Sequence, residues 1–163
     1  RMIYYYFGSK EQLYVEVLEK LYGDIRSTEN RLHLAELPPV EAIRRLVEFT
    51  FDHHDRNVDF VRIVSIENIH NAEYVKRSDA IKAMNNTILD SLSEILRRGA
   101  EEGVFRAGLD ALDVHLLISS FCFYRVSNRH TFGEIFQIDL PDESIKQRHR
   151  EMICESVLRY LQA

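Results

Sequence analysis

The sequence is poor in the residues that build tight turns. Its 163 residues include six glycines, three prolines and no tryptophan. Because glycine and proline supply the backbone conformations of most tight turns, this shortage argues against a turn-rich β protein. Hydrophobic residues make up 45% and charged residues 29%, which is an ordinary balance for one globular domain of this length.

The sequence also lacks a long apolar run. A membrane-spanning helix needs roughly eighteen consecutive apolar residues. The longest apolar segment, residues 114–124, is interrupted by His115, Ser119 and Ser120. No secretory signal is visible at the start of the sequence. We therefore expect no membrane partner.

Cysteine is scarce as well. Cys122 and Cys154 lie far apart in sequence, each in a segment with helical patterning. This arrangement does not indicate a disulfide framework, and it fits a protein kept in a reducing compartment. We therefore expect the protein in the cytoplasm.

Positive charge is not in excess. Lysine and arginine number 21 against 26 acidic residues, so the formal net charge is −5. A protein whose whole surface bound nucleic acid would be basic. An acidic chain is still compatible with a two-part protein, in which a small basic part makes the phosphate contacts and a larger acidic part has another role.

Catalytic and metal-binding motifs are missing too. There is no glycine-rich phosphate loop, no cysteine pair at metal spacing and no His-Glu-x-x-His signature. Cys122 and His115 lie two helical turns apart, too far for a nucleophile and its base. Adjacent His53 and His54 point about 100° apart on a helix, so we interpret them as imidazolium groups at a helix C-terminus. We expect no enzyme activity, no cofactor and no metal, with a cofactor-free enzyme in a helical shell as the least favoured alternative.

Apolar residues recur at helical spacing along almost the whole chain. This periodicity predicts an all-α fold, with Pro38 and Pro39 separating the first two helices and Gly103 ending a later one. Charged residues of the first helix are interpreted as a solvated face: Glu16, Glu19, Lys20, Asp24 and Arg26. The predicted helices cover residues 10–34, 39–54, 57–71, 78–102, 111–127 and 142–161, with a further short helix in 128–136.

The segment from Ile3 to Leu13 carries the most specific pattern. Ser9 followed by Gln12 fits a capping box at a helix start, and Gly8 before it can close a preceding helix in the left-handed conformation. Tyrosine hydroxyls and a lysine beside a helix N-terminus are suited to gripping phosphate oxygens.

This segment resembles the end of the recognition helix and the start of the following helix in TetR/AcrR-type transcriptional regulators. The resemblance implies that residues 1–9 are a remnant of a helix-turn-helix DNA-binding head. Residues 10–163 would then form a helical ligand-binding and dimerisation domain. In the family most of the head precedes this motif. The implied function is a DNA-binding transcriptional regulator, expected to be a repressor, that a small-molecule effector modulates. A helical interaction or scaffold domain without ligand remains the alternative.

The resemblance also assigns residues to operator DNA. Arg1, Met2 and Tyr4 fall where the family reaches base edges or the adjoining backbone, and Tyr4, Tyr6 and Lys10 fall where it grips phosphates. Tyr5 would pack or touch a base methyl, and plain helix packing is the alternative for Tyr5 and Tyr6.

A sensor needs a cavity, and polar residues that interrupt otherwise apolar helix faces are candidates to line it. Arg125 would hold an acidic group of the effector, because guanidinium forks match carboxylate geometry. The alternative is an internal Glu67–Arg125 ion pair. The predicted pocket residues are Phe49, Phe60, Ile63, Ile66, Glu67, His70, Asn85, Leu89, Phe121, Tyr124, Arg125 and Asn128.

The two helices predicted at 111–127 and 142–161 have more apolar residues than one core-facing stripe needs. We therefore expect them to pair with their symmetry mates in a homodimer, the alternative being that they only close the core of one chain. The predicted interface residues are His115, Ile118, Cys122, Met152, Ser156 and Tyr160.

Overall fold

The computed structural model describes residues 8–163, and within them regular structure is helical apart from one antiparallel bridge between Phe105 and Gln162. The all-α prediction is confirmed. No helix in this range has both the length and the apolarity needed to cross a membrane. The α-helices are α2 (Lys10–Asn30), α3 (Pro39–Arg56), α4 (Val58–Ile69), α5 (Asp79–Glu101), α6 (Ala111–Ser127), α7 (Arg129–Phe136) and α8 (Glu143–Leu161), with 3-10 turns η1 (Leu34–Glu36) and η2 (Val75–Arg77).

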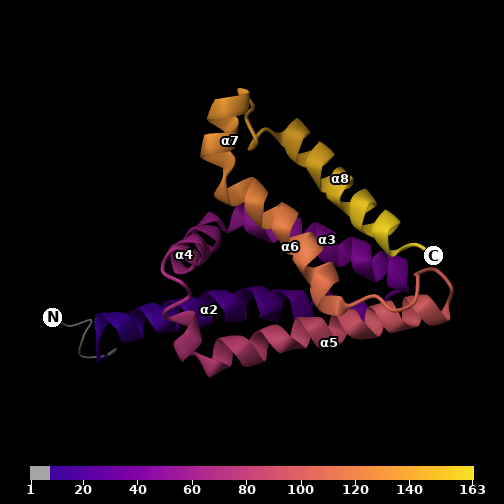
Figure 1. Cartoon of the computed structure of the whole chain (residues 1–163), viewed down its shortest axis with the longest axis horizontal. Helices are drawn as coiled ribbons and strands as arrows, with labels where there is room; N and C mark the ends of the chain where they lie inside the picture. Colours follow the sequence, from indigo (N-terminus) through magenta and orange to yellow (C-terminus); the bar gives the residue numbers. More distant parts are fainter. Residues whose placement is uncertain (1–7) are drawn as a thin grey trace.

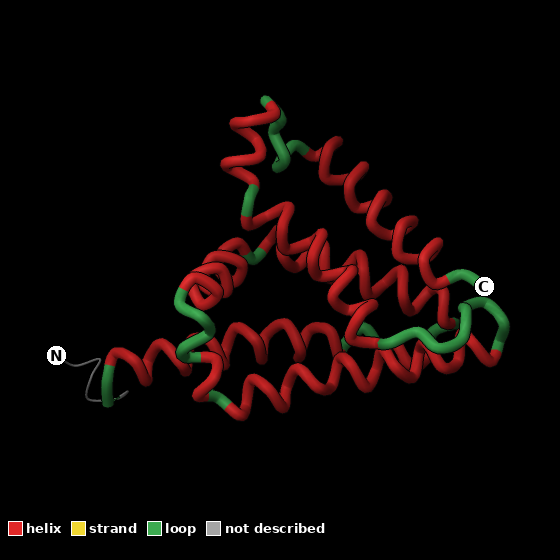
Figure 2. The backbone as a smooth tube through the Cα atoms, viewed as in Figure 1, coloured by secondary structure: helices red, strands yellow, loops and turns green. Residues whose placement is uncertain are grey.

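The helices form a bundle with a broad base and a narrow top (Figure 1). Helices α2 and α5 pack side by side along the base, and α3 packs against α6 and α8 above them. Helix α4 closes one side through contacts with α6 and α3, while α7 stands at the top and contacts α6. Short loops join most of these helices (Figure 2).

Polar side chains start the helices where the sequence predicted them. Ser9 accepts a hydrogen bond from the amide of Gln12 at 3.1 Å, and Asp110 and Asp142 each accept from two amides at the starts of α6 and α8. Ser78, rather than Asp79, caps α5. Each such cap stabilises a helix by about 1 kcal/mol, which explains why these starts are sharply defined.

Four helices end at other residues than predicted, with α4 ending at Ile69 instead of residue 71 and α5 at Glu101 instead of residue 102. Helix α2 ends at Asn30 instead of continuing to residue 34, and His33 then adopts left-handed φ of 51° before η1. Helix α3 continues to Arg56, and Asn57 caps its end. The Asn57 side-chain amide donates a hydrogen bond to the His53 carbonyl at 2.8 Å. Asn57 precedes α4 as predicted, but its side chain makes no capping bond there.

The apolar core lies between α3, α5, α6 and α8. Its cluster of buried residues includes Leu46, Leu92, Ile118 and Val157, each at most 1% exposed. Phe105 closes one end of this cluster by lying directly on Gly99 of α5. We call the part of the molecule built on this cluster the core half.

Candidate ligand cavity

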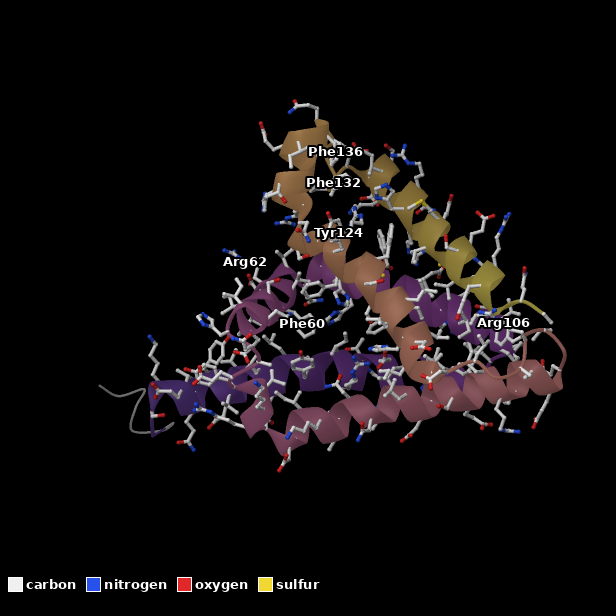
Figure 3. All side chains as sticks on the ribbon, viewed as in Figure 1. Phe60, Arg62, Arg106, Tyr124, Phe132 and Phe136 are labelled. Carbon is white, nitrogen blue, oxygen red and sulfur yellow. The ribbon has the colours of Figure 1, made fainter. Side chains whose placement is uncertain are left out.

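A cavity of about 560 Å³ lies in the other half of the bundle, between α2, α3, α4, α5 and α6. We call it the central cavity and the part of the molecule around it the cavity half, to which α3, α5 and α6 contribute as well as to the core half. Figure 3 shows Phe60 between α4 and α6, whereas Arg62 lies on the outer side of α4. The central cavity is lined by Tyr22, Ile25, Arg26, Glu29, Thr50, His54, Phe60, Val64, Asn68, Val75, Ile81, Lys82, Asn85, His115, Leu116, Ser119, Ser120 and Phe123.

Aromatic rings form one wall of the cavity. Phe60 meets Tyr22 edge to face with ring centroids 5.4 Å apart, and His54 meets Phe60 and Phe123 in the same way at 5.7 and 6.1 Å. Edge-to-face pairs hold rings in fixed orientations, so this wall is a preformed apolar surface.

A buried arginine lies one helical turn after Tyr22 on the same face of α2. Arg26 of α2 is 8% exposed; its Nε donates to Asn85 Oδ1 of α5 at 3.2 Å, and its Nη1 donates to Glu29 Oε2. Within residues 8–163 its Nη2 makes no hydrogen bond. Burial raises the pKa of Glu29, although Arg26 opposes this shift. The guanidinium therefore joins α2 to α5 and keeps the two N–H donors of Nη2 for the cavity that Arg26 lines.

Two neutral histidines complete the polar lining. His54 Nδ1 lies 2.7 Å from the Thr50 carbonyl oxygen, which requires a proton on Nδ1 and leaves a lone pair on Nε2. Burial, followed by the charge of Arg26 and by His54, lowers the pKa of His115 to about 4. Burial also lowers the pKa of His54.

These shifts correct the prediction for the end of α3. We expected His53 and His54 to be imidazolium groups that complement the helix dipole. Burial and the neighbouring His54 lower the pKa of His53 to about 4 instead. Desolvation therefore outweighs the helix dipole at this site.

Two of the predicted pocket residues, Phe60 and Asn85, line the central cavity. Phe49 lines a neighbouring hollow beside His53, and Phe121 lies edge to face with His149 against the apolar core. The rest lie elsewhere: Ile63 and Leu89 are half-buried, Tyr124 is exposed, Asn128 caps α6, and Ile66, Glu67 and His70 line a small pocket of about 230 Å³.

The role predicted for Arg125 is wrong in both of its versions. Its side chain is 5% exposed and bonds to Asp55 of α3 at 2.7 Å and to the Leu140 carbonyl, outside the central cavity. Glu67 does not pair with it, because the Glu67 carboxylate accepts the amides of Tyr74 and Val75 at 3.1 Å. Arg125 ties α6 to α3 and to the loop before α8.

Sequence reasoning missed Arg26, which we had placed on a solvated face. The signal was present: Tyr22, Arg26 and Glu29 lie four and three residues apart, so they share the helix face that also buries Leu18. The same pattern, a polar residue on an otherwise apolar helix face, led us to predict Asn85 as a pocket residue.

The predicted DNA contacts are described only at Lys10, the exposed first residue of α2. Arg1, Met2, Tyr4, Tyr5 and Tyr6 lie outside the described residues. Gly8 has the expected left-handed φ of 72° directly before the Ser9 cap.

The residues predicted for a dimer interface divide into two groups. Ile118 and Cys122 are 1% exposed within one chain, and His115 lines the central cavity. The other three, Met152, Ser156 and Tyr160, are exposed on α8. Seven exposed large apolar side chains of α6, α7 and α8 together make what we call the outer apolar face: Leu112, Leu116, Tyr124, Ile135, Phe136, Met152 and Tyr160. Tyr124 and Phe136 lie on α6 and α7 in Figure 3.

The comparisons with known proteins identify the family of this helical body. Residues 39–157 match the family described as "Tetracyclin repressor-like, C-terminal domain". The chain belongs to the TetR family of transcriptional regulators. It is 36% identical over 161 residues to the HTH-type transcriptional repressor NicS of Pseudomonas putida, a match that covers 99% of this chain and 76% of that protein.

Proposed function

We propose that the protein is a DNA-binding transcriptional repressor that a small molecule in the central cavity releases from its operator. The observation that carries this proposal is the central cavity itself, which is mostly apolar with a few convergent polar groups, as small-molecule sites are. Membership of the TetR family and the similarity to a transcriptional repressor support the DNA-binding part.

The helix α2 connects the two activities. Its first residue, Lys10, adjoins the head segment, and Arg26 in the same helix faces the cavity. An occupant that moves Arg26 relative to Asn85 would shift α2 against α5, and the head with it. Effector and operator must then weaken each other's binding by the same factor, because the coupling free energy is shared.

The outer apolar face supports a homodimer. Leu112, Leu116 and Tyr124 are spaced by multiples of four residues on α6, and Met152, Ser156 and Tyr160 repeat that spacing on α8, so each set shares one helix face. A two-fold pairing of this face would place two heads on successive major grooves, about 34–36 Å apart. Leu116 also lines the central cavity, so a partner would cover that side of it.

The test uses the protein with a complete head and an operator selected by that protein from random duplexes. Lys10→Ala should weaken binding to all duplexes alike and reduce the slope of log affinity against log salt by about one, since one phosphate contact is lost. Fluorescence anisotropy at several salt concentrations measures both quantities. The matched control is Lys20→Ala on the same helix, where Lys20 is exposed and pairs with Asp24 at 2.8 Å.

An unchanged slope for Lys10→Ala would remove this residue from the phosphate contacts. A protein with a complete head that selected no duplex at all would overturn the proposed DNA-binding function. Sedimentation of the same sample tests the dimer, which a monomer at micromolar concentration would contradict.

A further inference from the structure

We infer that the central cavity binds a small aromatic acid together with one proton. The inference rests on the proposed function, because it names the class of effector for that cavity. It follows from the balance of charges around the cavity, from the free donors of Arg26 and from the aromatic wall.

The titratable groups that face the cavity can be assigned helix by helix. Helix α2 contributes Tyr22, Arg26 and Glu29; α3 contributes His54; α5 contributes Lys82; and α6 contributes His115. The residues that α4 places there, Phe60, Val64 and Asn68, do not titrate. Lys82 is exposed and pairs with Asp79 at 3.0 Å, so it stays at the mouth.

The interior charges therefore cancel. Arg26 and Glu29 are one cation and one anion in contact, with side chains 10% and 6% exposed. His54 and His115 are neutral, since burial lowers the pKa of each. A ligand that brings a net charge into this space must bring compensation with it, because an uncompensated buried charge is strongly unfavourable.

Arg26 offers the place for an acidic oxygen. Its Nε donates to Asn85 and its Nη1 donates to Glu29, whereas Nη2 has no acceptor within residues 8–163. Because Arg26 lines the cavity, the two N–H groups of Nη2 are available to a ligand there. Hydrogen bonds from a guanidinium to an ionised oxygen are among the strongest in proteins. A neutral amide oxygen could accept the same bond, but with less energy.

A proton balances the added negative charge. His54, whose Nε2 carries the lone pair, lines the cavity from α3, and His115 lines it from α6. The charge of Arg26 is one cause of the low pKa of both histidines, so an anion placed on Arg26 raises both pKa values. The proton then lies on an imidazole or stays on the acid itself, and in both cases one proton enters with the anion.

The aromatic wall selects the remainder of the molecule. Tyr22, Phe60 and Phe123 present ring faces and edges at fixed angles, which favour a flat aromatic ligand over a flexible chain. A cavity of about 560 Å³ lies within the usual size range for sites of small organic ligands.

The experiment compares two probes of the same shape, 2-naphthoate and 2-naphthamide, by isothermal titration calorimetry. Measurements between pH 6 and 8, in buffers with different ionisation enthalpies, give the dissociation constant and the number of protons taken up. For naphthoate we expect uptake of about one proton and a dissociation constant that rises about tenfold per pH unit. Naphthamide should bind without proton uptake and with no pH dependence.

Substitution of Arg26 and Glu29 tests whether the naphthoate anion binds at Arg26. In Arg26→Gln/Glu29→Gln the ion pair is replaced by two neutral amides, so that neither partner is left as an unpaired charge. Naphthoate should bind at least about tenfold more weakly to this variant, and naphthamide nearly as well as to the wild type. Arg45→Gln on the outer surface of α3 is the control, because its side chain is 46% exposed and lies outside the cavity.

Three results would overturn the inference: no naphthoate binding at millimolar concentration, naphthoate binding without proton uptake, or naphthoate binding unchanged in the double variant. None of these results touches the proposed DNA-binding function, which the operator experiment tests without any ligand.

Discussion

The core half and the cavity half of this helical body bury different kinds of side chain. In the core half α3, α5, α6 and α8 bury apolar side chains against one another. In the cavity half the apolar cluster is small, centred on Phe60, Val61 and Val126, and charged or polar groups such as Arg26 and His54 are buried around a hollow. Arg26 and His54 of the cavity half are only 8% and 5% exposed, so burial of a single residue does not distinguish a stabilising region from a binding region.

The chemistry of the buried groups does distinguish them. Close packing in the core half lowers the free energy of the fold through apolar burial and dispersion. The cavity half forgoes part of that stabilisation and holds desolvated polar groups in place. A departure of this kind from the most stable arrangement is expected at functional sites.

The largest expected difference between the halves concerns a matched pair of isoleucines. Ile118 is 1% exposed inside the apolar core, and Ile25 is 3% exposed but lines the central cavity. Ile118→Ala should lower the free energy of unfolding by about 3–5 kcal/mol, because a new void forms in a packed region. Ile25→Ala should lower it by only about 1–2 kcal/mol, since part of that side chain already faces a void.

Urea unfolding followed by circular dichroism at one fixed protein concentration measures both values, because a dimer links stability to concentration. Equal losses would contradict the comparison, since they would mean that the cavity half packs as tightly as the core half.

The fold could be predicted because the sequence marks its helices with local signals. Ser9, Ser78, Asp110 and Asp142 fix helix starts through bonds to amides only two or three residues away. The end of α2 could not be predicted in this way, because no glycine or proline follows Asn30 directly and the left-handed residue after the helix is His33. A capping bond over two or three residues can be predicted from one sequence, whereas an unusual backbone conformation cannot.

The site was predictable only in part, and Arg125 and Arg26 explain why. Both are arginines on helix faces with apolar neighbours. Arg125 meets Asp55, 70 residues away in sequence, whereas Arg26 meets Asn85 of α5 and the cavity. Which arginine is structural and which faces a ligand depends on those distant partners. The spacing of residues predicts which face of a helix they share, but it does not predict which residues pack against that face.

Alanine substitutions at two helical glycines should change the free energy of unfolding by less, and with opposite sign in the two halves. A Cβ added at Gly99 would lie 2.0 Å from a ring carbon of Phe105, whereas one added at Gly23 would lie 3.6 Å from the sulfur of Met84. Gly99→Ala must displace the buried ring and should cost about 1–3 kcal/mol. Gly23→Ala makes an ordinary contact and should stabilise the protein by about 0.5–1 kcal/mol through helix propensity.

Thermal unfolding of the two variants against the wild type provides the test. A loss of stability in Gly23→Ala would show that α2 and α5 are packed more closely at Met84 than the structure indicates. No loss in Gly99→Ala would mean that Phe105 can leave its position at little cost.

The third comparison concerns pH and belongs to the cavity half. Burial lowers the pKa of His53 and His115 from 6.5 to about 4 in the folded protein. Between these values the unfolded chain binds protons that the folded protein does not, so stability is full above pH 6.5 and falls as the pH drops toward 4. At pH 5 each histidine should lower the free energy of unfolding by on the order of 1 kcal/mol relative to pH 7.

The double variant His53→Gln/His115→Gln isolates this contribution, because neither glutamine titrates. Its urea midpoint should fall less between pH 7 and 5 than that of the wild type, while carboxylates elsewhere affect both proteins alike. His130→Gln is the control, since His130 is exposed on α7 and its ring contacts water in both states. If the double variant lost as much stability as the wild type, the acid sensitivity would not come from these two histidines, and the cavity half would hold its imidazoles at no cost in stability at low pH.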